Sequence, residues 1–286
     1  MHHSDAKAAG VVLAGGRSSR MGTPKAALEW HGSTLLYRTA ALLARTVDGP
    51  VVVVAAPGQQ LPELPDGVQT VEDPVEGLGP MRGIATGLAA VAQDASAAFV
   101  CSTDMPFLHC AFVQRVLREF AEADTDVVLP TARGFRQPLA AVYRTTLAGL
   151  IARLAADGEL RPGMLFEHCR MQQMGDAELL ADTALYRFDP GLESVMNVNS
   201  PDEYAAARAR RPAEVTVQCF GALASPDRRG PRTVRAATLG DAAQAVGISL
   251  DKYVMAALNG DLITRDRQLP LVAGDTVALL SADAGG

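Results

Sequence analysis

Short apolar runs that alternate with amphipathic stretches constrain the fold of this chain more than any other feature. Two of the intervening stretches carry apolar residues at helical spacing, one including Met81, Ile84, Leu88 and Val91 and the other running from Phe112 to Phe120. Strands that alternate with helices pair in parallel, and both faces of their sheet are covered. We therefore predict an α/β domain with strands at residues 11–14, 51–55, 68–71, 97–101 and 126–130. In such sheets ligands bind beyond the carboxyl ends of the strands.

The pattern changes in the last quarter of the chain. A predicted helix at residues 201–210 runs into a tract of small and basic residues, 205–212, that is typical of a domain boundary. Beyond it, the alternation predicts a second, smaller α+β domain with a hairpin at Asn259-Gly260. Its predicted elements are strands at 215–217, 253–258 and 276–280 and a helix at 239–246. The predicted domains are residues 8–208 and 214–286.

Composition excludes several classes of protein. The chain has 286 residues, of which 48% are hydrophobic and 20% charged, as in ordinary globular proteins. With 32 acidic and 26 basic side chains the net charge is -6, which gives no broad positive field for nucleic acid. The 4 cysteines lack a CxxC pair, so neither a zinc cluster nor a disulfide framework is indicated. No uncharged run suits a membrane span, and no signal peptide is apparent, so we expect a cytoplasmic protein.

The loop after the first predicted strand is suited to phosphate. It contains Gly15 and Gly16, whose backbone N–H groups a phosphate can approach closely, and the cations Arg17, Arg20 and Lys25. It matches neither a Walker loop nor GxGxxG, and the glycines alone would fit an ordinary turn equally well. Three cations around one loop repel each other unless an anion lies among them. We therefore predict that this loop binds a triphosphate.

Two aspartates follow two other predicted strands. Asp104 follows the strand ending at Cys101, and Asp73 follows the strand ending at Val71. A carboxylate at a strand end is a ligand that Mg²⁺ prefers, with waters and phosphates as its other partners. The alternative for Asp104 is a cap for the helix before Phe112. We predict a metal and phosphate site in which Asp104 is the metal ligand.

Two further segments are candidates for nucleotide or acceptor contacts. Gly79 lies in a glycine-dense segment just before a predicted helix, where a base or ribose can rest on the backbone, although an ordinary loop is the alternative. Asn197 and Asn199 are two residues apart, so an extended backbone would present both amides on one face. Such amides suit ribose or pterin edges. Equally, Asn199 or Ser200 would cap the helix that follows.

Together, several of these motifs resemble the molybdenum cofactor guanylyltransferase family, called MobA, over roughly residues 8–208. The motifs are LAGG, RMG, PK, the Glu-Asp pair ending at Asp73, GPMRGI, STDMPF and NVNSPDE. The resemblance implies a Rossmann-like fold and a magnesium-dependent transfer of GMP from GTP onto the terminal phosphate of molybdopterin, with release of pyrophosphate. It also implies GTP contacts by Leu13, Ala14, Gly15 and Lys25, a nucleoside contact by Asp73 and the metal at Asp104.

The expected mechanism is in-line displacement at the α-phosphate by the acceptor phosphate. In this hypothesis Mg²⁺ on Asp104 bridges phosphate oxygens, and Lys25 with Arg20 offsets the charge that develops toward pyrophosphate. The family often has an asparagine where this chain has Ala55-Ala56-Pro57. The choice of guanine is therefore open, and CTP is the alternative because cytidylyltransferase relatives share the LAGG, RMG and PK motifs. A sugar or alcohol phosphate is a separate alternative for the acceptor.

The segment 214–286 resembles the MoaD and ThiS sulfur carriers, which are small ubiquitin-like (β-grasp) domains ending in Gly-Gly. The resemblance rests on residues 215–220, Leu258-Asn259-Gly260, the AGDTVALL segment at 273–280 and the terminal Gly285-Gly286. It implies adenylation and thiocarboxylation at Gly286. It also implies two protein partners, an adenylating enzyme and the large molybdopterin synthase subunit. Residues 281–283 depart from the proline-rich turn common in these carriers.

Overall fold

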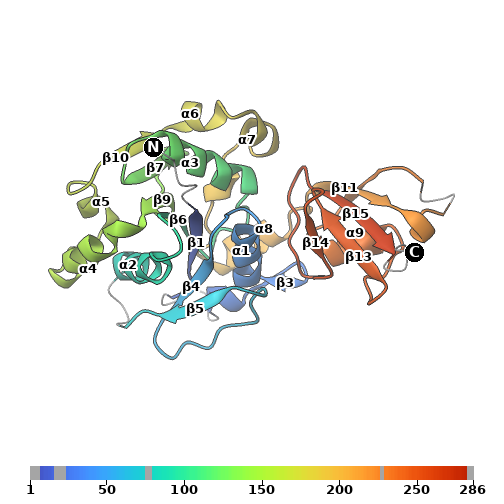
Figure 1. The fold of residues 1–286 in the computed structure, drawn as a ribbon, viewed down its shortest axis with the longest axis horizontal. Coiled ribbons are helices and arrows are strands. Elements are labelled where there is room, and N and C mark those ends of the chain that lie inside the picture. The colour runs from blue at the N-terminus through green and yellow to red at the C-terminus, as the bar shows by residue number, and fades with distance from the viewer. Residues whose placement is uncertain (1–6, 16–23, 75–78, 226–228, 282–286) are drawn as a thin grey trace. The chain divides into compact units, whose positions relative to one another are not determined.

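The structure is a computed structural model that describes residues 7–15, 24–74, 79–225 and 229–281. The chain divides into two compact units (Figure 1). The first comprises Met1–Leu28 and Leu35–Tyr204, and the second comprises Glu29–Thr34 and Ala205–Gly286. We describe each unit by itself.

The first unit is built on a mostly parallel sheet. Its central strands are apolar on both faces, and β4 is buried along its whole length. The order is β10-β7-β9-β6-β1-β4-β5, with β8 paired to β7. Its strands are β1 (Ala8–Leu13), β4 (Val51–Ala55), β5 (Gln69–Glu72), β6 (Ala97–Ser102), β7 (Val127–Ala132), β8 (Phe135–Arg136), β9 (Ala140–Arg144) and β10 (Met171–Met174).

Helices cover both faces of this sheet. One face is covered by α2 and α4, which lie side by side (Figure 1). They pack against side chains that project from neighbouring strands, namely Val11, Val52 and Val100. On the other face, Phe99 of β6 meets Phe112 of α3 edge to face. The helices of four or more residues in this unit are α1 (Leu35–Ala44), α2 (Pro80–Val91), α3 (Cys110–Glu122), α4 (Ala148–Ala156), α5 (Pro162–Leu165), α6 (Asp176–Leu180) and α7 (Thr183–Phe188). The helix α8 (Pro201–Arg208) continues into the second unit.

The sequence-based strands of this unit are confirmed, with ends that differ by at most three residues, and the α/β class with a mostly parallel sheet is confirmed as well. The helices predicted around Met81 and Phe112 are α2 and α3. Three strands were not predicted, β8, β9 and β10, and β9 runs antiparallel to β6 and β7 between them. Because β6 and β7 are both antiparallel to β9, they run in the same direction and end at the same edge of the sheet.

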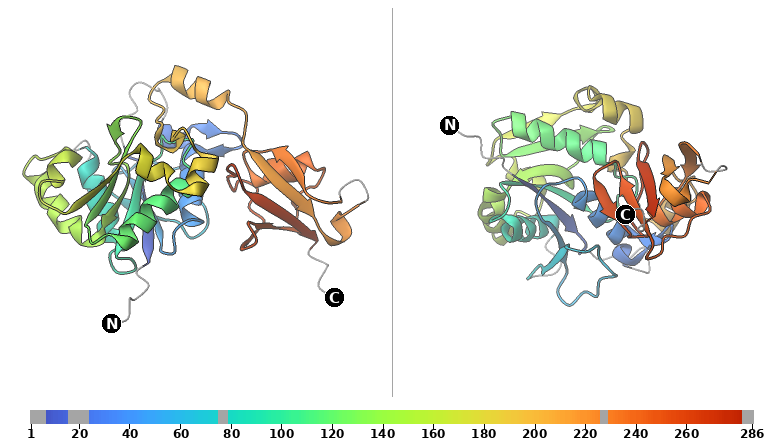
Figure 2. Two further views of the ribbon diagram at one scale, coloured as in Figure 1. Left: turned by 90° about the horizontal axis from the view of Figure 1, so that it is seen from above. Right: turned by 45° about the vertical axis from the view of Figure 1, so that its right-hand side comes forward.

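The second unit contains a mixed five-stranded sheet of order β12-β11-β15-β13-β14, with β11 parallel to β15 and the other pairs antiparallel. The helix α9 (Leu239–Ala245) lies on one face of this sheet (Figure 2). Asn259 and Gly260 have φ values of 55° and 87°, as a tight hairpin turn requires, which confirms the predicted hairpin. The strands are β11 (Glu214–Cys219), β12 (Arg232–Arg235), β13 (Val254–Leu258), β14 (Leu262–Thr264) and β15 (Thr276–Ser281).

A short hairpin from the amino-terminal part of the chain also groups with the second unit. It is formed by β2 (Glu29–Trp30) and β3 (Ser33–Thr34), and Arg208 of α8 forms an ion pair with Glu29. The sequence carried no signal that would have separated this hairpin from the surrounding α/β domain.

Candidate functional site

Three polar side chains meet at the carboxyl edge of the sheet in the first unit. Lys25 begins the 3₁₀ helix η1 (Lys25–Ala27), Asp104 lies two residues beyond β6, and Asn199 precedes α8. The Lys25 Nζ donates to Asp104 Oδ2 over 2.7 Å and to Asn199 Oδ1 over 2.8 Å. The side chains of Lys25 and Asp104 are 21% and 14% exposed, so water screens this ion pair only in part. A cation, a carboxylate and an amide therefore meet at one point.

Two further bonds hold Asp104. Ser102 Oγ donates to Asp104 Oδ1 over 2.5 Å, and Val198 N donates to the Asp104 backbone oxygen over 2.9 Å. The alternative role of Asp104 as a helix cap is wrong. The cap of α3 is His109, whose Nδ1 accepts from Ala111 N over 3.0 Å.

The segment before α8 combines the two roles that the sequence left open. Ser200 Oγ accepts from Glu203 N, and the Glu203 carboxylate accepts from the backbone N–H groups of Asn199 and Ser200, which is a capping box. Ser200 therefore caps α8, while the Asn199 side chain contacts Lys25. Asn197 is exposed and, within the described part of the chain, makes no hydrogen bond through its side chain. Glu203 was missed as a supporting residue, although the Ser-x-x-Glu spacing signals it.

The loop after β1 is fastened to the loop after β4. The N–H groups of Ala14 and Gly15 both donate to Val54 O, over 2.9 and 3.2 Å. A Cβ on Gly15 would lie 3.2 Å from Ala56 N, so glycine permits this close approach. Gln59, which the sequence did not single out, bridges the two loops by donating to Ala14 O and accepting from Ala56 N.

Leu13 contributes to this loop only through its backbone, because its side chain is buried and faces Gly83 of α2. The predicted site residues Gly16, Arg20 and Gly286 lie outside the described residues.

Asp73 and Gly79 lie where β5 ends and α2 begins. Asp73 Oδ1 is 3.5 Å from Arg82 Nε, and Asp73 N donates to Ala55 O. Gly79 is the N-cap of α2 with φ of 71°, which favours glycine. Asp73 thus pairs with a cation of α2, whereas Asp104 pairs with Lys25.

No three His, Cys, Asp or Glu side chains gather as a metal group in the described ranges.

The thiol beneath the site is not a nucleophile. Cys101 is the residue before Ser102 at the end of β6, and burial together with the neighbouring Asp104 carboxylate raises the pKa of its thiol far above neutral. The thiol therefore stays protonated, and only a thiolate attacks substrates efficiently.

Comparisons with known proteins show the family of the chain. The family model of the MobA-like NTP transferase domain matches residues 10–173. A probable molybdenum cofactor guanylyltransferase of Mycobacterium bovis is 43% identical over 162 residues, covering 56% of this chain and 79% of the relative. The Mycobacterium ulcerans protein with the same description is 40% identical over 179 residues, covering 61% of this chain and 87% of the relative.

A solved structure supports the fold. The molybdopterin-guanine dinucleotide biosynthesis protein A from Archaeoglobus fulgidus superimposes with a TM-score of 0.57 at 21% identity, covering 70% of this chain and 96% of that one. At this identity the likeness bears on the fold alone. The family model, in contrast, covers more than half of the sequence. The chain therefore belongs to the MobA-like NTP transferase family, and its first unit is a nucleotidyltransferase.

Proposed function

We propose that the first unit transfers GMP from GTP to the terminal phosphate of molybdopterin, in its molybdenum-loaded form, with release of pyrophosphate. The observation that carries the proposal is the convergence of Lys25, Asp104 and Asn199 at the carboxyl edge of the sheet. The names of the relatives point to the same reaction. No general base is needed, because a phosphate nucleophile is already ionised near neutral pH.

The residues at this edge fit a magnesium ion. Mg²⁺ takes oxygen ligands and usually keeps waters and substrate phosphates among them. One carboxylate from the protein is therefore enough to bind it. Asp104 would supply that carboxylate, and Ser102 orients it. When bound, Mg²⁺ neutralises negative charge on phosphate oxygens.

The chain's own groups would act by position and charge. Lys25 would offset charge on the triphosphate, because its ammonium already lies at the meeting point of the carboxylate and the amide. The backbone of Leu13, Ala14 and Gly15, which is fixed to β4, would line the nucleotide site. Asp73 and Gly79 would face the nucleoside, and Asn197 and Asn199 the ribose or the acceptor. Gly16 and Arg20 are assigned to the triphosphate from the sequence.

The test of the site uses Asp104→Asn and Lys25→Met, assayed for pyrophosphate release with GTP, Mg²⁺ and molybdenum-loaded molybdopterin. We expect turnover to fall about 10²-fold or more, as when a preorganised electrostatic group is lost. Asp124→Asn and Lys7→Met are matched controls on exposed side chains. Near-normal turnover of the Asp104 and Lys25 variants would remove the proposed site.

The choice of nucleotide and acceptor has its own test. The same assay with CTP in place of GTP, and with a sugar phosphate in place of molybdopterin, distinguishes the alternatives. Preference for CTP would make the protein a cytidylyltransferase of the same cofactor pathway. Transfer only to a sugar or alcohol phosphate would overturn the proposed acceptor.

We propose a second function for residues 214–286, that of a β-grasp sulfur carrier for molybdopterin synthesis. The strand order of the second unit, with two parallel central strands and one helix on the sheet, supports it. In this proposal Gly286 is adenylated and then thiocarboxylated, and the partners are an adenylating enzyme and the large molybdopterin synthase subunit.

Removal of Gly285 and Gly286 tests the carrier. We expect the shortened chain to accept no sulfur while it still transfers nucleotide, because the proposal gives the tail a role in the carrier function alone. Mass spectrometry of the intact carboxyl terminus, after incubation with an activating enzyme, ATP and a sulfur donor, gives the readout. An unmodified full-length terminus would contradict the carrier function.

A further inference from the structure

An exposed aromatic side chain lies on a hairpin at the site's edge of the sheet. Phe135 of β8 is 74% exposed, and it follows the two-residue turn Arg133-Gly134 that joins β7 to β8. Single exposed apolar side chains are common on protein surfaces and carry no meaning alone. Phe135 is of interest because of its position and because its hairpin is braced by hydrogen bonds.

The β7–β8 hairpin is braced by several hydrogen bonds. Arg133 and Gly134 have φ values of 56° and 83°, the left-handed pair that a tight two-residue hairpin uses. Gln137 closes the hairpin by donating from Nε2 to the backbone oxygens of Ala132 and Phe135. Arg133 is fastened from both ends, since its N–H donates to Asp176 Oδ1 and its Nη1 donates to Gly191 O over 2.7 Å. A ligand that met Phe135 would therefore meet a preorganised surface.

The hairpin and Asp104 lie at the same edge of the sheet. The strands β6 and β7 run in the same direction with only β9 between them, so their carboxyl ends lie side by side. Neighbouring strands are about 4.8 Å apart, which separates β7 from β6 by roughly 10 Å where both strands pair with β9. This is the span of a small molecule that carries a ring system at one end and a phosphate at the other.

Phe135 also belongs to the α3 side of the sheet. It pairs with Ala132, and paired residues of two strands project from the same face. Residues Val127 and Leu129 project toward the core that contains α2, so the alternate residue Ala132 projects from the opposite face. That opposite face is the one on which Phe99 meets α3.

On the α3 side of the sheet, one segment of the chain runs from the hairpin to the site formed by Lys25, Asp104 and Asn199. It is residues 191–199, which we call the strap. Gly191 at its start accepts from Arg133, Ser194 accepts from the N–H of His109 at the start of α3, and Val198 near its end donates to Asp104 O. The exposed amide of Asn197 lies on the strap between the two ends.

We propose that the β7–β8 hairpin is the ring-binding half of the acceptor site. The acceptor's phosphate would lie at Lys25 and Asp104, its body along the strap, and its flat heteroaromatic ring against Phe135. Arg133 uses one of its five N–H donors on Gly191, so its guanidinium retains charge and donors for an anionic substituent. The ligand class is a planar, anionic, pterin-like phosphate monoester. This inference rests on the proposed nucleotidyl transfer and adds the residues that select the acceptor.

The test compares Phe135→Leu, Phe135→Tyr and Tyr186→Leu in the full-length protein. Leu keeps an apolar side chain of similar size but cannot stack, whereas Tyr retains the ring. Tyr186, on α7, is 63% exposed and serves as a matched aromatic control. Steady-state rates are measured with molybdenum-loaded molybdopterin varied at saturating GTP, and then with GTP varied.

We expect Phe135→Leu to raise the KM for molybdopterin about tenfold while the KM for GTP stays the same, in line with the loss of one aromatic stacking contact. Phe135→Tyr and Tyr186→Leu should behave like the wild type. If the wild-type protein transfers GMP and Phe135→Leu leaves the acceptor KM unchanged, or raises both KM values equally, the hairpin site is wrong although the activity stands. If the wild-type protein transfers nothing to molybdopterin, the proposed function fails and this inference fails with it.

Discussion

The orientation of one carboxylate is the central feature of the site at the scale of residues. Asp104 has its two oxygens assigned to different donors, Ser102 Oγ on Oδ1 and Lys25 Nζ on Oδ2. A carboxylate held in this way presents its remaining lone pairs in a fixed direction, which is what a metal site requires of its supporting groups.

Ser102→Ala tests this orientation. We expect the Mg²⁺ concentration needed for half-maximal turnover to rise roughly tenfold, because loss of an outer hydrogen bond to a metal ligand typically costs 10–100-fold in affinity or activity. Turnover at each Mg²⁺ concentration is the measurement. Ser96→Ala, which changes a partly buried serine just before β6, should leave the curve in place. An unchanged Mg²⁺ dependence in Ser102→Ala would show that Asp104 is oriented without it.

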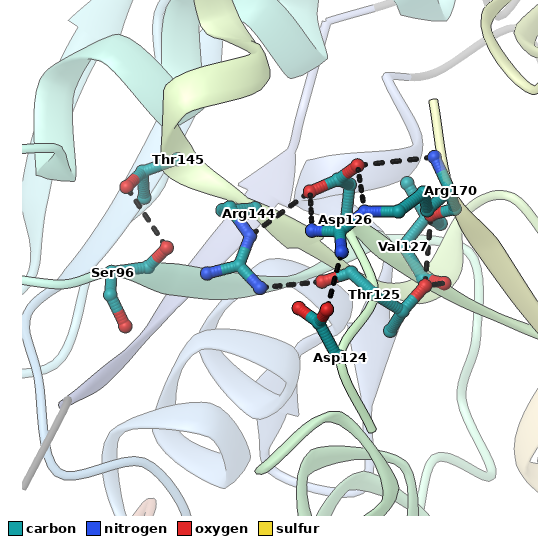
Figure 3. Close-up of polar contacts among 8 residues, drawn as sticks. All are labelled: Ser96, Asp124, Thr125, Asp126, Val127, Arg144, Thr145 and Arg170. Carbon is teal, nitrogen blue, oxygen red and sulfur yellow. Dashed lines mark hydrogen bonds and ion pairs between the residues drawn. The ribbon is translucent and has the colours of Figure 1, made fainter. Parts of the chain in front are cut away.

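At the scale of elements, three strands are joined at the sheet edge opposite the site. Asp126 just before β7 accepts from Arg144 at the end of β9 and from Arg170 just before β10 (Figure 3). The hydrogen bonds from Arg170 are the main cause that lowers the pKa of the Asp126 carboxyl below its ordinary value of 3.8, and the charge of Arg144 adds to this. This network joins the start of β7 to the end of β9 and the start of β10.

A lowered pKa in the folded state makes stability depend on pH in one direction. The Asp126 contribution is fully present above the carboxyl's ordinary pKa and is lost as the pH falls below about 3.8 toward the folded-state value. We expect Asp126→Asn to lower the free energy of unfolding at pH 7 by about 1–3 kcal/mol, the range for hydrogen bonds to charged groups. The difference in the free energy of unfolding between wild type and variant should shrink as the pH falls below about 3.8. Urea unfolding at several pH values measures this difference.

Asp124→Asn is the control for this network. Its carboxylate pairs with the same Arg170 but is 87% exposed, so solvent screens the ion pair and little stability should be lost. Two results would contradict the stabilising role of Asp126. One is an equal loss of unfolding free energy in both variants, and the other is a loss in Asp126→Asn that does not change with pH.

The helix α2 packs closely against β1 through Gly87. A Cβ on Gly87 of α2 would lie 2.3 Å from Val11 Cγ1, so the helix approaches the strand closely only because this residue is glycine.

Gly87→Ala should destabilise the first unit by about 1–3 kcal/mol, as overpacking of a filled core does. Gly149→Ala in α4 is the matched control, because its added Cβ would meet only the end of Arg153 at 3.8 Å, and removing glycine from a helix gains about 0.5–1 kcal/mol. Thermal melts of both variants give the comparison. Loss of stability in Gly149→Ala, or none in Gly87→Ala, would refute the packing argument.

At the scale of the whole molecule, the two compact units differ in construction, one around a mostly parallel sheet and the other around a mixed five-stranded sheet. No helix in the ranges that the structure describes is long and apolar enough to cross a membrane. The domain limits 8–208 and 214–286 remain sequence-based predictions. In the structure, the second compact unit begins at Ala205 and also includes the hairpin at Glu29–Thr34.

The sequence by itself determined the elements whose patterns are local. Buried strands such as Val51–Ala55, the amphipathic face of α3 and the Asn259-Gly260 turn follow from periodicity and backbone preference, which neighbouring residues impose. It also indicated the site residues Lys25, Asp104 and Asn199, because charged and amide groups next to strand or helix ends signal ligand contact.

Only the tertiary structure decided which of these groups meet. The 2.7 Å contact of Lys25 with Asp104, the bridge from Gln59 to Ala14, and the insertion of β9 between β6 and β7 each join residues far apart in the chain. The same holds for the hydrogen bond from Arg133 to Gly191 at the start of the strap. Such contacts depend on how the sheet orders its strands, and strand order is set by packing across the whole core, which no local pattern encodes.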